Sequence, residues 1–150
     1  MPLLNFSRPQ TIAILFLAVL LVIFGFYTLT PAKRLKARQE ALIEWARSGA
    51  PSDFGKDFAS SSYEDQWGHT PAEVAERVRA ARFAYRNLTI EEQPPELTLS
   101  GRTGTVVQGI SAHLGDGESR QFTLHCTWER ESIWPWSWKL RKVEAPDLRF

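Results

Sequence analysis

The sequence predicts an α+β domain that follows an N-terminal transmembrane helix, with helices packed on an antiparallel sheet. Three observations support this fold class: an uncharged apolar run near the N-terminus, helical periodicity up to Tyr85, and alternation of apolar and polar residues after Asn87. Helices that precede a set of consecutive strands have to cover the apolar face of the sheet, which gives a two-layer domain.

The chain has 150 residues, enough for one domain with a hydrophobic core, and a net charge of +1. Every acidic residue lies after Pro31, where the chain also carries a basic stretch: Lys33, Arg34, Lys36 and Arg38. The remainder is mildly acidic, which argues against a nucleic-acid partner, because such proteins need basic charge on the folded face. Cys126 is the single cysteine, so an internal disulfide is excluded and a small buried residue is predicted.

The apolar run, Ile12 to Leu29, carries no charge. Eighteen helical residues span about 27 Å, close to the hydrocarbon thickness of a bilayer. The run exceeds the roughly 7–15 residues of a signal-peptide core, so an uncleaved anchor is favoured over a signal peptide cleaved near Thr30-Pro31-Ala32. We therefore expect a membrane anchor at residues 1–30, in contact with the lipid bilayer, and a folded domain at residues 31–150.

The charges that flank the apolar run predict the side of the membrane. The N-terminal flank contains the α-amino group and Arg8, whereas the basic stretch follows the run closely. The positive-inside rule then places the C-terminal domain in the cytoplasm. A folded domain can also be translocated past a modest basic flank, so a periplasmic domain is the alternative. Either placement gives a single-pass membrane protein.

Two long helices are predicted before the strands. The first begins at Pro31, capped by Thr30, and continues to about Gly49. The second follows the capping box that Thr70 forms with Glu73, and it runs to about Tyr85. Between them, we expect a short helix over residues 52–58 and a loop over residues 59–62. The second long helix is expected to bury one stripe, Val74, Val78, Ala81 and Tyr85. Its arginines are expected to be solvated: Arg77, Arg79, Arg82 and Arg86.

The strands after Asn87 are predicted to form an antiparallel meander. Two short strands, at residues 88–90 and 97–99, flank a break at Pro94-Pro95. Two longer strands, at residues 103–114 and 121–130, are joined by the turn Gly115-Asp116-Gly117. The last strand covers about residues 136–143.

Two short motifs resemble the nuclear transport factor 2-like superfamily, which includes SnoaL and polyketide-cyclase-like domains. YEDQWGHTPAEV (Tyr63 to Val74) is similar to the superfamily's Tyr-x-Asp-x-x-Gly stretch before its third helix, and SWKLRKV (Ser137 to Val143) is similar to the end of its last strand. The resemblance covers roughly residues 32–145 and implies a curved, cone-like sheet wrapped around the N-terminal helices. Membrane-anchored bacterial members are similar in layout, which implies the bacterial inner (cytoplasmic) membrane. The superfamily has many activities, so the fold does not supply a function.

Candidate catalytic residues cluster just before Thr70. Asp65 could act as a general base in the cone, with Tyr63 or His69 as hydrogen-bond donor and Tyr85 in the same pocket. A structural interpretation is favoured instead, in which Asp65 accepts backbone N–H groups in a turn that Gly68 completes.

Neither a metal nor another cofactor is predicted. His113 and His125 face outward on predicted neighbouring strands, but a zinc site needs three or four ligands and the sequence offers no third. The sequence also contains no Ser/His/Asp nucleophile motif, phosphate-binding glycine loop or CxxC pair.

Three tryptophans share the stretch SIWPWSWKL, which runs from Ser132 to Leu140. Parity along the strands predicts that Trp138, like Trp128 on the partner strand, lines the inner wall of the sheet. Three residues lie near the hairpin turn and are predicted to contact a protein partner or the bilayer interface: Trp134, Pro135 and Trp136.

These features favour a membrane-anchored, non-catalytic domain that binds a protein partner, forms a homo-oligomer or helps to assemble a membrane complex. The alternative is a small-ligand-binding or cyclase/isomerase-like enzyme that uses the cone pocket with Asp65 as base. The environment of Asp65 separates these hypotheses, because a side chain in a deep, partly polar cavity favours the second.

Overall fold

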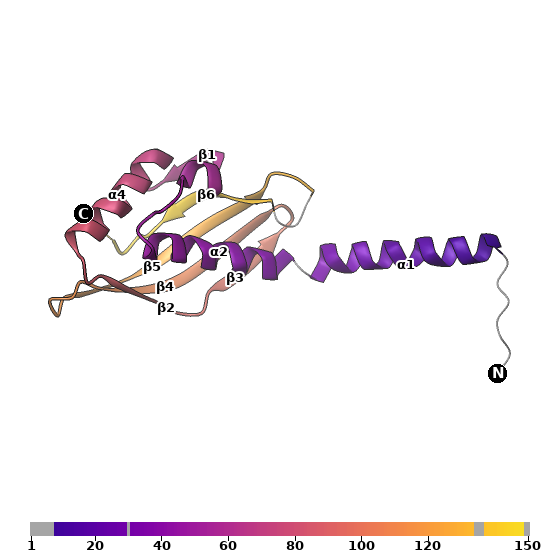
Figure 1. The fold of residues 1–150 in the computed structure, drawn as a ribbon, viewed down its shortest axis with the longest axis horizontal. Helices are drawn as coiled ribbons and strands as arrows, with labels where there is room; N and C mark the ends of the chain where they lie inside the picture. Colours follow the sequence, from indigo (N-terminus) through magenta and orange to yellow (C-terminus); the bar gives the residue numbers. More distant parts are fainter. Residues whose placement is uncertain (1–7, 30, 134–136, 149–150) are drawn as a thin grey trace. The chain divides into compact units, whose positions relative to one another are not determined.

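The computed structural model describes residues 8–29, 31–133 and 137–148 (Figure 1). The chain divides into two compact units, residues 1–31 and 32–150. Helix α1 (Arg8–Leu29) is the element of the first unit, and the second unit contains the other helices and the sheet.

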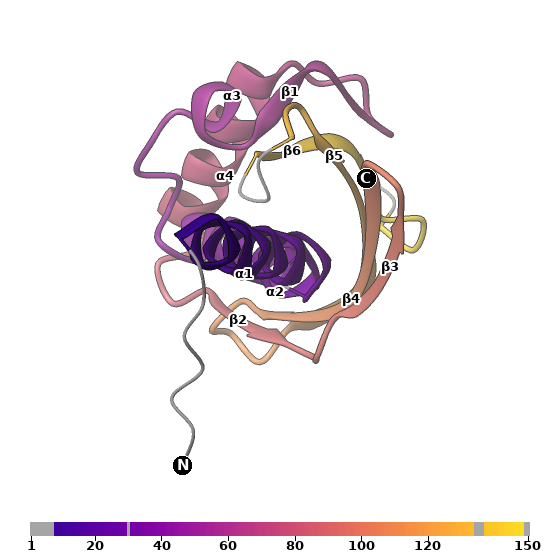
Figure 2. The same ribbon diagram turned by 90° about the vertical axis from the view of Figure 1, so that its right-hand side faces the viewer.

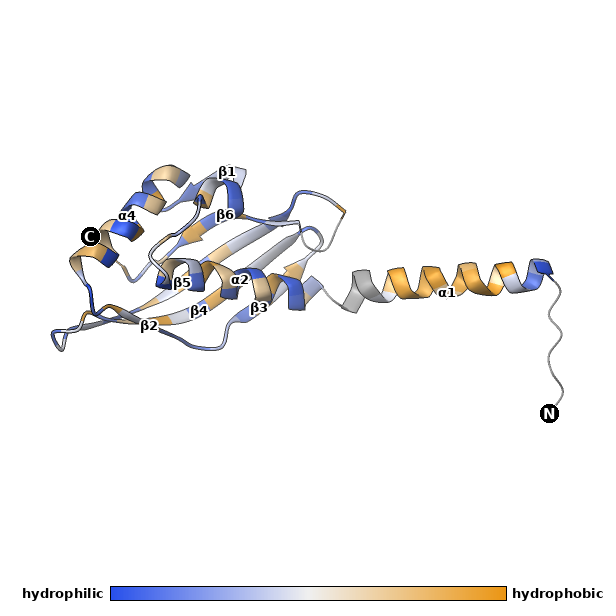
Figure 3. Cartoon of the chain, viewed as in Figure 1, coloured by the Kyte–Doolittle hydropathy of each residue, from blue (hydrophilic) through white to orange (hydrophobic). Residues whose placement is uncertain are grey.

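Helix α1 is apolar on all sides. Ile12 is 68% exposed, Phe16 is 65% exposed and Val22 is 72% exposed, and most residues in the described part of the helix are coloured as hydrophobic in Figure 3. Among the described residues, one segment, Arg8–Gly25, is long and apolar enough to cross a membrane. A signal sequence meets the same criteria. The helix therefore has the character of a membrane anchor or of a signal sequence.

The second unit is an α+β domain with a curved, unclosed sheet, as predicted. Its helices are α2 (Pro31–Arg47), α3 (Phe54–Asp57) and α4 (Pro71–Ala84). Its strands are β1 (Ala59–Asp65), β2 (Thr89–Glu92), β3 (Glu96–Ser100), β4 (Thr103–His113), β5 (Ser119–Arg130) and β6 (Trp138–Glu144). The strand order is β1-β6-β5-β4-β2, and β3 also pairs with β4. Figure 2 shows the sheet curving around α2.

The prediction of a loop over residues 59–62 is wrong, because these residues belong to β1. This strand pairs in parallel with β6, so the sheet is not an all-antiparallel meander, and Ala59 lies opposite Leu140. The Leu140 amide donates to the Phe58 carbonyl over 2.7 Å. The three serines at 60–62 show no apolar alternation, and the strand forms because β6 offers a backbone ladder beside it.

The core lies between α2 and the inner face of the sheet. Leu35 of α2 is fully buried there. Trp128 on β5 and Trp138 on β6 are 0% and 1% exposed, which confirms that both rings line the inner wall. The described core cluster consists of residues of the second unit. Residues 32–150 therefore bury their own core, and we expect them to fold as an independent domain.

A chain of polar side chains crosses the middle of this core. Trp128 Nε1 donates to Gln39 Oε1 over 3.0 Å, and Gln39 Nε2 donates to Gln108 Oε1 over 3.0 Å. Gln108 Nε2 then donates to the backbone carbonyl of Gln93 over 2.9 Å. Gln39 and Gln108 are 0% and 2% exposed. Because these buried groups find partners only in one arrangement, the network fixes α2 on the sheet.

Cys126 lies in the same core and is 0% exposed, as predicted from its place in an alternating strand. Burial raises the pKa of its thiol to about 12, so the side chain stays protonated at neutral pH. Cys126 is therefore a packing residue.

Helix α4 begins as predicted but packs less closely than predicted. The Thr70 hydroxyl accepts from the Glu73 amide over 3.3 Å, and the Glu73 carboxylate accepts from the Thr70 amide over 2.7 Å. Ala75 is the fully buried residue of the helix. The four residues expected to be buried are half-buried or, for the last, 43% exposed: Val74, Val78, Ala81 and Tyr85. Helix α4 therefore covers the sheet without sealing against it.

Candidate functional site

Asp65 ends β1 and organises the turn that leads into α4. Its Oδ1 atom accepts the backbone amides of Trp67 and His69, both over 2.9 Å. Gly68 takes a φ of +73° in this turn, a conformation that side chains other than glycine rarely adopt. Asp65 therefore makes the backbone hydrogen bonds that its predicted structural role in this turn requires.

The second oxygen of Asp65 faces two side chains. His69 Nδ1 lies 3.3 Å from Asp65 Oδ2, and the Tyr63 hydroxyl donates to the same oxygen over 3.5 Å. The Asp65 side chain is 1% exposed, whereas that of His69 is 18% exposed. A carboxylate that holds Nδ1 orients the imidazole, so Nε2 is the ring nitrogen left for a ligand.

Tyr63 remains a proton donor in this arrangement. Burial raises the pKa of the Tyr63 phenol above its ordinary range, and the charge of Asp65 raises it further. The ring packs edge-on against Phe54 at a centroid distance of 5.4 Å, which holds the hydroxyl in place. The hydroxyl is therefore protonated at any physiological pH.

These residues line a cleft of about 530 Å³ between α4 and the inner face of the sheet. Most of its wall is apolar and comes from α4, β5, β6 and the segment after β6: Val74, Val78, Ala80, Ala81, Phe122, Val143 and Leu148. Five further residues line it, namely Tyr63, Asp65, Trp67, His69 and Arg77. The arrangement combines an apolar cavity with a few convergent polar groups, the usual form of a small-molecule site.

The cleft joins three of the four predicted catalytic candidates. Tyr63, Asp65 and His69 line it together, whereas Tyr85 follows the end of α4 and is not among its described lining residues. Val74 and Val78 were not predicted to line a cleft, because helical periodicity shows which residues face inward but not whether the space beside them is filled. Arg77 was not predicted as a cleft residue either, although its spacing from Val74 and Ala81 places it on the same side of the helix.

The two histidines weighed as metal ligands lie apart on the outer face. His113 is opposite Ser119 in the β4–β5 ladder and His125 is opposite Val107, so they occupy different parts of it. His113 Nε2 lies 3.5 Å from Glu91 Oε2. The described residues contain no group of three side chains able to hold a metal ion.

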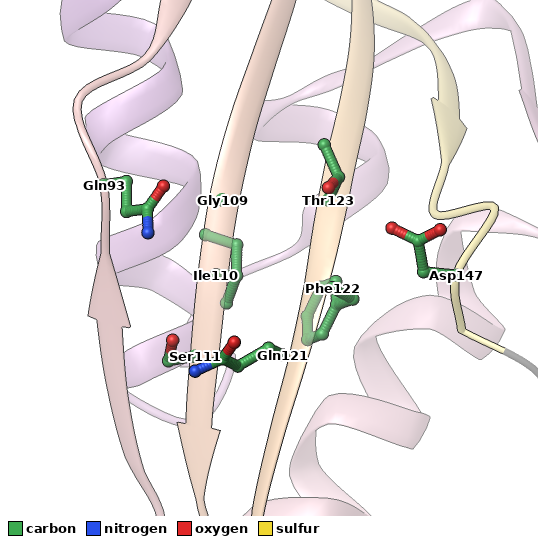
Figure 4. A pocket seen from close by; sticks show the side chains of 8 residues that line it. All are labelled: Gln93, Gly109, Ile110, Ser111, Gln121, Phe122, Thr123 and Asp147. Carbon is green, nitrogen blue, oxygen red and sulfur yellow. The ribbon is translucent and has the colours of Figure 1, made fainter.

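A smaller recess of about 200 Å³ lies over β4 and β5 (Figure 4). Gln93 and Asp147 flank it, and Gly109, Ser111 and Thr123 are among the small residues at its floor. It contains none of the predicted candidates. The predicted contact residues Trp134, Pro135 and Trp136 lie outside the described residues, and the adjoining Ile133 is 71% exposed.

Several solved structures share this fold. A nuclear transport factor 2-like protein with a cystatin-like fold from Novosphingobium aromaticivorans is 16% identical with a TM-score of 0.60, over 94% of this chain and 90% of that one. Kfla4162 from Kribbella flavida is 12% identical with a TM-score of 0.64, over 77% and 89% of the two chains. The S. rosetta CaMKII hub is 14% identical with a TM-score of 0.53, over 75% and 92%.

The likeness establishes the nuclear transport factor 2-like fold and so confirms the fold that the two sequence motifs implied. Identities this low show the fold alone. The sequence matches no protein-family model and no curated protein. The function has therefore to be argued from the cleft.

Proposed function

We propose that residues 32–150 form a ligand-binding domain that accepts a small, largely apolar molecule in the cleft between α4 and the sheet. The cleft itself is the observation that carries this proposal: about 530 Å³ with apolar walls, beside the hydrogen-bonded Tyr63, Asp65 and His69. Its volume falls within the range of sites that hold small ligands. The apolar wall supplies affinity, and the polar groups orient the ligand.

His69 is the group that can exchange a proton with a bound ligand. Asp65 is a poor general base, because its two oxygens already face two backbone amides and the side chains of Tyr63 and His69. Asp65 therefore acts as a positioning residue that holds the imidazole of His69 with Nε2 available. Any reaction in the cleft would then be a proton transfer through His69, with the Tyr63 hydroxyl as a nearby donor.

The proposal is tested by filling the cleft with a side chain. The probe is N-phenylnaphthylamine, an uncharged dye that fluoresces in apolar sites, and the protein is residues 32–150 after its cooperative unfolding has been verified. Val78→Trp places a large ring in the cleft and is expected to weaken dye binding at least about 10-fold. Ala84→Trp, at an exposed position of the same helix, is the matched control and is expected to bind like the wild type. Equal binding by Val78→Trp and wild type, or no binding by either, would refute the proposal.

The proposal includes a membrane anchor at residues 1–30 and the folded domain at residues 31–150, held at the bacterial inner membrane. The supporting observation is that the described part of α1 is apolar on all sides and exposed. The basic stretch after α1 supports a cytoplasmic domain, with a periplasmic one as the alternative. Intact-mass measurement of the membrane-extracted protein separates an anchor from a cleaved signal, and C-terminal reporter fusions active on one side only identify the compartment.

A second candidate function is assembly with a protein partner or a second copy of the chain. The observation that favours assembly is the exposure of Ile133, which is 71% exposed and precedes Trp134 in the sequence. Exposed apolar residues often mark contact sites. The fold is also that of a structure named as a hub. Light scattering on residues 32–150 tests the homo-oligomer: Ile133→Asp should convert an oligomer to a monomer. A monomeric wild type would exclude self-assembly through this surface.

A further inference from the structure

The charges that line the cleft show which ligands it can accept. The side chain of Asp65 is 1% exposed and surrounded by hydrogen-bond donors, so its negative charge is already compensated. Tyr63 is a protonated, neutral donor. Arg77 is exposed and, among the described residues, makes no hydrogen bond or ion pair. The charge that remains for a ligand in the described wall is therefore the positive charge of Arg77.

The other arginines of α4 differ from Arg77. The Arg79 Nε donates to the Ala50 carbonyl over 3.1 Å, and Arg82 donates to the Leu88 carbonyl. Both guanidinium groups therefore hold α4 to neighbouring segments. Glu73, one helical turn before Arg77, interacts electrostatically with it, but the Glu73 carboxylate is also bonded to the Thr70 amide in the cap. Within the described part of the chain, Arg77 thus makes no hydrogen bond or salt bridge, although it stands beside an apolar cavity.

From this arrangement we infer that the cleft binds an amphipathic anion, a molecule with an apolar body and a carboxylate, sulfonate or phosphate group that Arg77 receives. The inference rests on the proposed ligand-binding function and specifies its ligand class. A guanidinium matches the planar, two-oxygen edge of such anions and can donate to both oxygens. Because Arg77 is exposed, the anionic group stays at the solvated mouth while the apolar body enters the cleft. A small inorganic anion alone would leave the apolar wall unfilled.

The test compares two dyes that share an aromatic skeleton and differ in charge. Anilinonaphthalene sulfonate is the anion, N-phenylnaphthylamine is the uncharged partner, and the protein is residues 32–150. The wild type is expected to bind the anion about 10-fold more tightly than the uncharged dye, a difference of about 1.4 kcal/mol. Arg77→Gln should weaken binding of the anion much more than binding of the uncharged dye, and so remove most of this preference. Added salt should reduce the preference in the wild type but not in Arg77→Gln.

Two further variants keep the inference distinct from the proposed function. Arg86→Gln removes a charge near the end of α4 that is not among the lining residues, and it should retain the wild-type preference. Arg77→Lys keeps the charge but loses the paired donors, and it should retain part of the preference. If the uncharged dye binds and Val78→Trp blocks it, yet Arg77→Gln keeps the full preference for the anion, the inference is overturned while the proposed function stands. If Val78→Trp affects neither dye, the proposed function fails first.

Discussion

Helices α2 and α4 both pack against the core of the domain, but they do so in opposite ways. Helix α2 buries five residues: Leu35, Gln39, Leu42, Ile43 and Trp45. Helix α4, of similar length, buries Ala75 alone, and its Val74 and Val78 remain half-buried at the edge of the cleft. One helix buries a row of side chains against the sheet, and the other leaves a cavity beside it.

The difference agrees with the two tasks that the proposed function gives to the domain. The α2 side holds Trp128 and Trp138 and a polar chain in which every member is bonded, so it specifies one position of the helix on the sheet. The α4 side holds His69 and Arg77, the polar residues that we propose to meet a ligand. A rigid side supports a site on the open side, because the cleft keeps its shape only if the sheet beneath it does not move.

The largest effect on stability is expected from a variant on the α2 side, where the core is filled. Trp128→Ala removes a ring that is 0% exposed, and we expect it to lower the free energy of unfolding by about 3–5 kcal/mol. Phe122→Ala is the matched change on the open side, where the ring is half-buried and lines the cleft, and we expect a loss of less than about 2 kcal/mol. Urea unfolding of residues 32–150 measures both. Equal losses would mean that the two sides are packed alike.

A smaller effect is expected from breaking the polar chain. Gln39→Leu keeps the volume but leaves Trp128 Nε1 and Gln108 Oε1 without their partner, and we expect a loss of about 1–3 kcal/mol. Combining it with Gln108→Leu should cost less than the sum of the two single variants, because the two residues belong to one network. Additive losses in the double-variant cycle would contradict a coupled network.

The smallest effect is expected at the start of α4. Thr70→Ala removes the hydroxyl that caps the helix and should cost about 1 kcal/mol, whereas Thr70→Ser keeps the bond and should cost less. Thermal unfolding measures the loss. Because α4 forms one wall of the cleft, Thr70→Ala should also weaken dye binding. A fully stable Thr70→Ala variant would show that packing, not the cap, positions α4.

The features that were predictable from sequence depend on neighbours along the chain. The capping box of Thr70 and Glu73 acts within one helical turn, and the turn at Gly115 to Gly117 joins β4 to β5 as expected. Trp128 and Trp138 could be assigned to the inner face because strand parity extends over several residues of one segment. The apolar run of α1 was predictable for the same reason, since length and composition are properties of a single segment.

The remaining features depend on segments that are distant in the chain. The serines of β1 became a strand because β6, far along the chain, lies parallel to them. Residues of α4 that face inward became the wall of a cleft, since the distance between a helix and a sheet is set by the packing of the whole core. The turn bonds of Asp65 are local and were predicted, whereas the position of Arg77 beside an apolar cavity depends on segments that only folding brings together. Caps, turns and strand faces are thus predictable from this sequence, because they depend on neighbouring residues. The cavity that forms the candidate site exists only after the chain has packed.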